Sequence, residues 1–184
     1  MIVLAVLAAI ILYGIFAYNA LTRLRLLANG AWADIDVQLK RRHDLVPRLV
    51  ETVKGHAGYE RGTIEAVVAA RNRATAASGP AASGTAEGEL TGAVRQVFAL
   101  AEAYPDLKAG ESFLSLQRAL TEIEDHIQNA RRYYNAVVRD LNTKVAQFPS
   151  NLIAGPFGIG PREFFGLTDA ADAAAPGIDF GRKP

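Results

Sequence analysis

A long helical pattern runs through AGESFLSLQRALTEIEDHIQNARRYYNAVVRDLNTKVAQ, residues 109–147. Apolar side chains recur there mostly in alternating steps of three and four, the spacing of one face of an α-helix. They are Phe113, Leu116, Leu120, Ile123, Ile127, Ala130, Tyr134, Val137, Leu141 and Val145. The charged residues fall elsewhere on the helix and form a solvated face. The segment therefore predicts one long helix with a single apolar seam, ended by Pro149.

Upstream of this helix, residues 21–43 also favour a helix that continues from the N-terminal segment. Asp44 is a good N-cap, and Pro47 is tolerated in a first helical turn because the N–H it lacks has no partner there. A turn at residues 42–44 and a second helix over residues 45–76 are therefore expected. Gly55 and Gly58 can kink or break that second helix.

Residues 77–88 are rich in Gly, Ser, Pro and Ala, so they predict a flexible loop between two helical hairpins. A shorter helix follows over residues 89–103, and Tyr104-Pro105 stops it before the last helix. The fold class expected from the sequence is all-α.

The N-terminus is apolar, and the first charged side chain is Arg23. The roughly 20 residues of segment 1–21 would span about 30 Å as a helix, the thickness of the hydrocarbon core of a bilayer. We therefore predict a transmembrane anchor over residues 1–21. Its spanning side chains are Ile2, Val3, Leu4, Val6, Leu7, Ile10, Ile11, Leu12, Ile15 and Phe16.

A cleaved signal peptide is the alternative for this segment, but it needs a basic start and small residues at the cleavage site. No Lys or Arg precedes the apolar run, and Tyr18 and Asn19 occupy the candidate cleavage region. A retained anchor is favoured. Because the nearby basic residues all follow the span, the positive-inside rule predicts a single-pass protein of the cell membrane, with an outside N-terminus and a cytoplasmic domain.

The rest of the chain suits one helical domain over residues 22–148 and a tail over residues 149–184. The tail is rich in Gly and Pro; we expect it to be irregular, docked in part to about residue 167 and disordered beyond. Phe157, Phe164 and Phe165 are candidates for docking. Twenty basic against 19 acidic residues indicate neither nucleic acid nor an acidic substrate as partner. The absence of Cys excludes disulfides and thiolate chemistry.

No catalytic or metal-binding pattern stands out in the sequence. A di-iron bundle needs Glu-x-x-His pairs, but Lys40, Val53 and Ile123 stand three positions before the three histidines. No Gly-x-Ser-x-Gly elbow or phosphate-binding glycine loop occurs. We therefore expect no catalytic residue, metal, cofactor or small-molecule substrate, and no enzymatic activity.

A basic cluster near the expected turn is the candidate interaction site: Lys40, Arg41, Arg42 and Arg48. Its structural alternative is favourable placement at a helix C-terminus, with Asp44 as a pairing partner. As a surface cluster, it predicts that Ala at Arg42 or Arg48 leaves the melting temperature nearly unchanged. Elsewhere, Gln128, Asn135 and Asn142 recur every seven residues and suggest an interhelical amide ladder or a binding stripe.

Three motifs carry a resemblance to a known family. They are Arg41-Arg42-His43-Asp44-Leu45-Val46-Pro47, Glu102-Ala103-Tyr104-Pro105-Asp106-Leu107-Lys108-Ala109, and Ala130-Arg131-Arg132-Tyr133-Tyr134-Asn135. In this order they resemble the signatures of the LemA family, with Arg48 and Leu141 departing from its usual residues. The positions that define the resemblance are Asp44, Pro47, Tyr104, Pro105, Arg131, Tyr134 and Asn135.

The resemblance implies an N-terminal membrane anchor joined to an antiparallel four-helix bundle. It implies no established activity: the members are bacterial membrane proteins, and one branch is associated with magnetosome membranes. The leading hypothesis is a membrane-anchored scaffold or adaptor of the bacterial envelope, whose partners are the lipid bilayer and an envelope protein. The alternatives are a membrane-shaping or organelle-forming component that acts by self-association, and an unrecognised enzyme.

Overall fold

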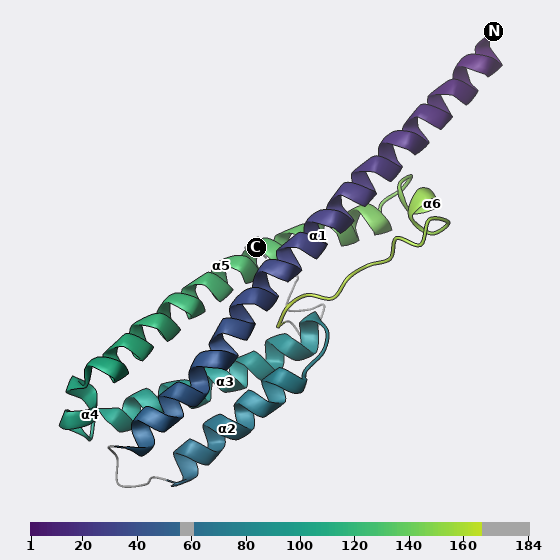
Figure 1. The fold of residues 1–184 in the computed structure, drawn as a ribbon. Helices are drawn as coiled ribbons and strands as arrows, with labels where there is room; N and C mark the ends of the chain where they lie inside the picture. Colours follow the sequence, from purple (N-terminus) through teal and green to yellow (C-terminus); the bar gives the residue numbers. More distant parts are fainter. Residues whose placement is uncertain (56–60, 167–184) are drawn as a thin grey trace, which may run out of the picture.

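The computed structural model describes residues 1–55 and 61–166 and is helical throughout, without a strand in those residues (Figure 1). Its helices are α1 (Ile2–Lys54), α2 (Arg61–Ala76), α3 (Pro80–Ala101), α4 (Pro105–Ala109), α5 (Glu111–Ala146) and α6 (Asn151–Ala154). The all-α class expected from the sequence is confirmed.

Helix α1 continues without a break from the apolar N-terminus to Lys54 and spans 53 residues, or about 80 Å at 1.5 Å per residue. The turn expected at residues 42–44 is therefore wrong: Asp44 caps no helix, and Pro47 lies inside α1. Figure 1 shows the N-terminal part of α1 projecting well beyond the other helices.

A contact from α2 compensates for the proline within α1. Because Pro47 has no N–H, the carbonyl of His43 loses its normal partner four residues along the helix. The Nε of Arg71 in α2 donates to that carbonyl at 2.8 Å. This side chain satisfies the freed acceptor and explains how α1 continues past a residue that favours a helix start.

The second helix expected over residues 45–76 is divided between two helices, with its first ten residues in α1. Helix α1 ends at Lys54, before Gly55, where the sequence predicted a possible break, and α2 begins at Arg61. Gly55, where α1 ends, thus matters more to the topology than the Asp44–Pro47 pair does.

The loop expected over residues 77–88 is mostly helix, because α3 begins at Pro80. Proline fits the first turn of a helix, and the positive φ of Gly79 (84°) turns the chain into it. Gly84 lies against the C-terminal segment: a methyl group there would lie 2.1 Å from the Gly166 nitrogen. Gly84, one of the small residues that suggested a loop, thus serves this close backbone approach.

Helix α5 agrees with the sequence prediction to within two residues at each end. The stop at Tyr104-Pro105 is also confirmed: α3 ends at Ala101, and Pro105 opens the short helix α4. The strong seam and the proline are local signals, so these boundaries could be found without tertiary information.

Two hydrophobic clusters form most of the core. The first joins the end of α1 to α2, α3, α4 and the start of α5, with Val46, Leu49, Val67, Leu90 and Val97 among its members. The second joins the middle of α1 to α5 and Phe165 and includes Ile123 and Ile127. These two isoleucines of the apolar seam are buried, and their cluster draws its buried residues from α1, α5 and residue 165.

The described part of the tail runs back along the helices after α6 (Figure 1). Phe165 is buried, Phe164 is half-buried, and Phe157 is exposed but lies with its ring centroid 4.7 Å from that of Tyr18. In the structure this segment lies against the helices as far as Gly166. The disorder expected beyond about residue 167 lies outside the described residues.

Candidate interaction surface

The four basic candidates occupy different environments. Lys40, Arg41 and Arg48 are exposed on α1, whereas Arg42 is 4% exposed and points into the helical domain. The four residues look like one charged cluster in the sequence. The helix places three of them on its solvent-exposed face and turns Arg42 to its buried face.

Arg42 is the centre of a polar network that links three helices. Its Nη1 lies 3.3 Å from Glu87 Oε2 in α3 and 3.1 Å from Glu124 Oε2 in α5. Its Nη2 donates to Thr91 Oγ1 at 2.7 Å. The planar guanidinium thus serves several acceptors at once, which suits arginine better than lysine.

Two further side chains complete this network. His43 Nε2 donates to Glu87 Oε1 at 2.5 Å, since a carboxylate can only accept. Gln128 Nε2 donates to Glu124 Oε1 at 2.8 Å. The carboxylates of Glu87 and Glu124 therefore each have two or more partners. We interpret the network as structural: it holds α1, α3 and α5 together.

The amides of Asn135 and Asn142 bind the tail backbone rather than another helix. Asn135 accepts from the Phe165 N–H at 2.9 Å and donates to the Phe165 carbonyl at 3.2 Å. Asn142 makes the same pair of bonds with Arg162, at 2.8 and 2.9 Å. The seven-residue spacing suggested an interhelical amide ladder or a binding stripe. Instead, Asn135 and Asn142 bind the tail, and Gln128 belongs to the Arg42 network.

Tyr134 reinforces this docking. Its hydroxyl donates to the Glu163 carbonyl at 2.9 Å, and its ring packs 5.7 Å from that of Trp32. Burial raises the pKa of Tyr134 above its usual value of 10.0, although the nearby Arg162 opposes the shift. The hydroxyl therefore remains a proton donor at neutral pH.

The other signature positions also have structural placements. Asp44 is exposed, Tyr104 packs partly against the first core cluster, and the guanidinium of Arg131 lies beside Gly166. With Tyr134 and Asn135, Arg131 thus lines the path of the docked tail, a role the sequence alone did not suggest.

Replacing Asn135 with Ala should release the Phe165 amide to solvent. We expect its hydrogen exchange to accelerate roughly tenfold, the loss of about 1.4 kcal/mol of local protection. The Arg162 amide, held by Asn142, should change much less. Site-resolved hydrogen exchange measures both, with Asn129→Ala on the exposed side of α5 as the control. Equal exchange in Asn135→Ala and Asn129→Ala would show that the amide does not hold the tail.

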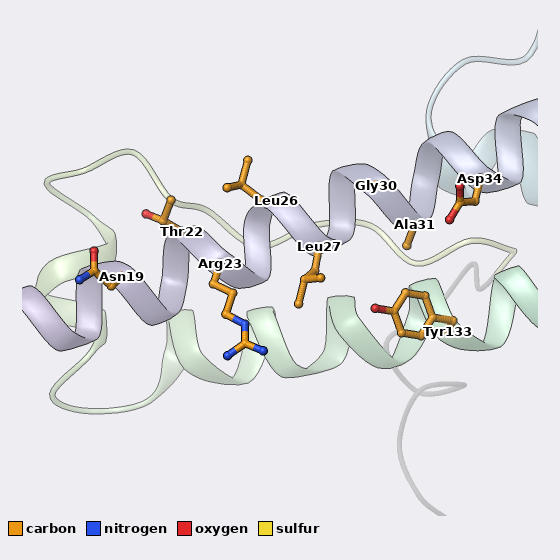
Figure 2. Close-up of a pocket in the computed structure, with 9 residues that line it drawn as sticks. All are labelled: Asn19, Thr22, Arg23, Leu26, Leu27, Gly30, Ala31, Asp34 and Tyr133. Carbon is orange, nitrogen blue, oxygen red and sulfur yellow. The ribbon is translucent and has the colours of Figure 1, made fainter.

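A shallow groove of about 530 Å³ lies along α1 near the start of the domain, and Tyr133 of α5 forms part of its wall (Figure 2). Its lining residues are Asn19, Thr22, Arg23, Leu26, Leu27, Gly30, Ala31, Asp34 and Tyr133. Leu26 is 60% exposed. Figure 2 shows Leu26 projecting away from α5, whereas Arg23 and Leu27 point toward it. This surface was not expected from the sequence, although the exposed apolar spacing along residues 26–37 could have indicated it.

The ten predicted spanning residues are all exposed along α1, with Phe16 at 81%. Within the described residues α1 is the one helix long and apolar enough to cross a membrane. Those same residues hold no group of three His, Asp or Glu side chains that could bind a metal ion.

The architecture is therefore that of an all-helical protein with one N-terminal candidate membrane span. The chain belongs to the LemA family, which matches it over residues 31–180. The resemblance found in the three sequence motifs is confirmed.

The curated relatives are distant. Magnetosome protein MamQ 2 of Paramagnetospirillum magneticum is 23% identical over 84% of this chain. MamQ of Magnetospirillum gryphiswaldense is 22% identical over the same share. Protein LemA of Metamycoplasma hominis is 25% identical over 62% of the chain. The chain spans 66% of the length of these MamQ proteins and 53% of that LemA protein.

Proposed function

We propose that this protein is a membrane-anchored, non-catalytic scaffold or adaptor of the bacterial envelope, built as a four-helix bundle on a single span. The observation that carries the proposal is the continuity of α1, which joins the exposed apolar segment to both core clusters without a break. Such a helix holds the domain at a fixed position relative to the bilayer. Relatives described as magnetosome proteins support a role at a membrane.

The exposed basic residues of α1 are the proposed contact for a protein partner. Lys40 lies 19 residues beyond Leu21, or about 28 Å along the helix, and Arg48 lies about 40 Å beyond it. Both distances exceed the Debye length of about 8 Å at physiological salt, so these charges do not act on lipid headgroups. A partner with an acidic surface fits them. Arg23 and Arg25 are better placed for the headgroups.

Photocrosslinking in living cells tests the adaptor proposal. A photoreactive amino acid at Arg48 should capture one protein at a constant ratio, and Lys40→Glu in the same chain should abolish that capture. Arg139→Glu on the exposed face of α5 is the matched control. Capture unaffected by the charge reversal would contradict the proposed contact. Substrate turnover by the purified full chain would favour the enzyme alternative instead.

The proposed orientation places the domain in the cytoplasm, because the basic residues Arg23, Arg25, Lys40, Arg41 and Arg42 follow the span. A reporter fused after Pro184 should therefore be active as a cytoplasmic fluorescent protein and inactive as alkaline phosphatase. An active phosphatase fusion would reverse the orientation, and with it the compartment in which a partner should be sought.

A further inference from the structure

We propose that two copies of this chain associate in parallel along the outer face of α1, through a seam formed by Leu26, Gly30, Ala33 and Val37. The seam lies on α1 before Lys40 and Arg48, with Arg41 flanking its end, and the pairing does not require the adaptor role. The occupant of the exposed apolar face is thus a second copy of the same chain.

The seam has the spacing of a coiled coil. Its four residues follow one another in steps of four, three and four, and all are exposed, Leu26 at 60% and Val37 at 50%. The opposite side of α1 already faces the domain through Ala28 and Ile35. The outer face is therefore the side left for a second helix, and Gly30 allows its backbone to approach closely.

The same spacing continues into the apolar segment. Steps of three and four lead back from Leu26 through Arg23, Asn19, Phe16, Leu12, Ala9 and Ala5, all of them exposed. Arg23 turns aside toward α5 in Figure 2 and leaves the line open. Asn19 on this line favours a parallel, in-register pair, because its amide can bond with its own copy only when the helices are aligned.

Membrane topology and charge favour a second copy as the partner. Copies with the same orientation in one bilayer must meet in parallel, which aligns identical seams. In that arrangement Asp36 of one copy lies beside the seam and opposite Arg41 of the second copy. This five-residue offset is the one at which opposite charges attract across a parallel coiled coil. Both side chains are exposed, and within the described residues no ion pair engages them. Because the dimer has two-fold symmetry, this Asp36–Arg41 ion pair occurs twice.

Cysteine crosslinking of the purified full chain in lipid vesicles tests this pairing. Because the sequence contains no Cys, a single Ala33→Cys reports one position. Mild oxidation should yield a covalent dimer, whereas Ala136→Cys on the exposed face of α5 should stay monomeric. Similar yields at the two positions, or a monomeric Ala33→Cys, would overturn the proposal.

Charge exchange separates the proposed register from random collision. Asp36→Arg in the Ala33→Cys background should lower the association constant roughly fivefold, since two favourable pairs become repulsive. Adding Arg41→Asp should restore it. Lack of restoration would contradict the parallel register, and a crosslink to a different protein in native membranes would assign the face to that partner. Neither result depends on capture at Arg48, so failure of the two proposals can be distinguished.

Discussion

Replacing Arg42 with Ala should strongly destabilise the helical domain. The substitution leaves Glu87 buried without its cation and removes a donor to Thr91. Removing one partner of a buried ion pair typically costs about 3–5 kcal/mol, a large share of a domain's total stability. Thermal or denaturant unfolding of the full chain in detergent, followed by circular dichroism, measures the effect. The sequence-based expectation of an unchanged melting temperature is replaced by this one.

Arg41→Ala is the matched control, because Arg41 is adjacent in sequence but exposed. Its melting temperature should stay close to that of the unaltered protein. Arg42→Lys should fall between the two, since it keeps the charge but loses the planar guanidinium. If Arg42→Ala and Arg41→Ala melted alike, the network would contribute little, and Arg42 would return to the candidate contact surface.

Replacing Ile127 with Asp should also cause a large loss of stability. Ile127 is 2% exposed in the cluster shared by α1, α5 and Phe165. The change removes a packed side chain, leaves a void and buries a charge with no partner, each a recognised cause of large destabilisation. We expect a loss of several kcal/mol, about 3–5 by analogy with other core truncations. The same unfolding experiment measures it.

Ala136→Asp places the same charge on the exposed side of the same helix and should be nearly neutral. The comparison separates burial from any general effect of an acidic residue on α5. A benign Ile127→Asp would mean that the seam of α5 does not form the core of the domain.

Local signals in the sequence were sufficient for α5 and for the apolar start of α1. The ten seam residues of α5 repeat so regularly that only a helix accommodates them, and Pro149 lies close to its end. The continuation of α1 past Pro47 could not be found in this way, because it depends on Arg71, which is distant in sequence and satisfies the His43 carbonyl. Sequence-local rules assign the proline to a helix start, whereas a tertiary contact removes part of its cost.

The same distinction applies to α3 and to the basic cluster. A Gly/Ala/Ser-rich stretch favours a loop on composition, but Gly84 serves a contact with Gly166, which is 82 residues away in sequence. In the sequence, Arg42 cannot be distinguished from its exposed neighbours. Its direction depends on the unbroken course of α1, which points its side chain toward Glu87 and Glu124. Asn135 and Asn142 were identified by their spacing, but their partner, the tail backbone, has no sequence pattern of its own.

A distance measurement across α1 tests the central claim, that one rigid helix joins the proposed membrane span to the domain. Spin labels at Asn19→Cys and Glu51→Cys, on the full chain in lipid bilayers and diluted with unlabelled protein, enclose both the end of the span and Pro47. Thirty-two residues of continuous helix predict one narrow distance distribution near 48 Å, at about 1.5 Å per residue. A broad distribution, or one centred well below that value, would mean that α1 bends or breaks and would contradict the account.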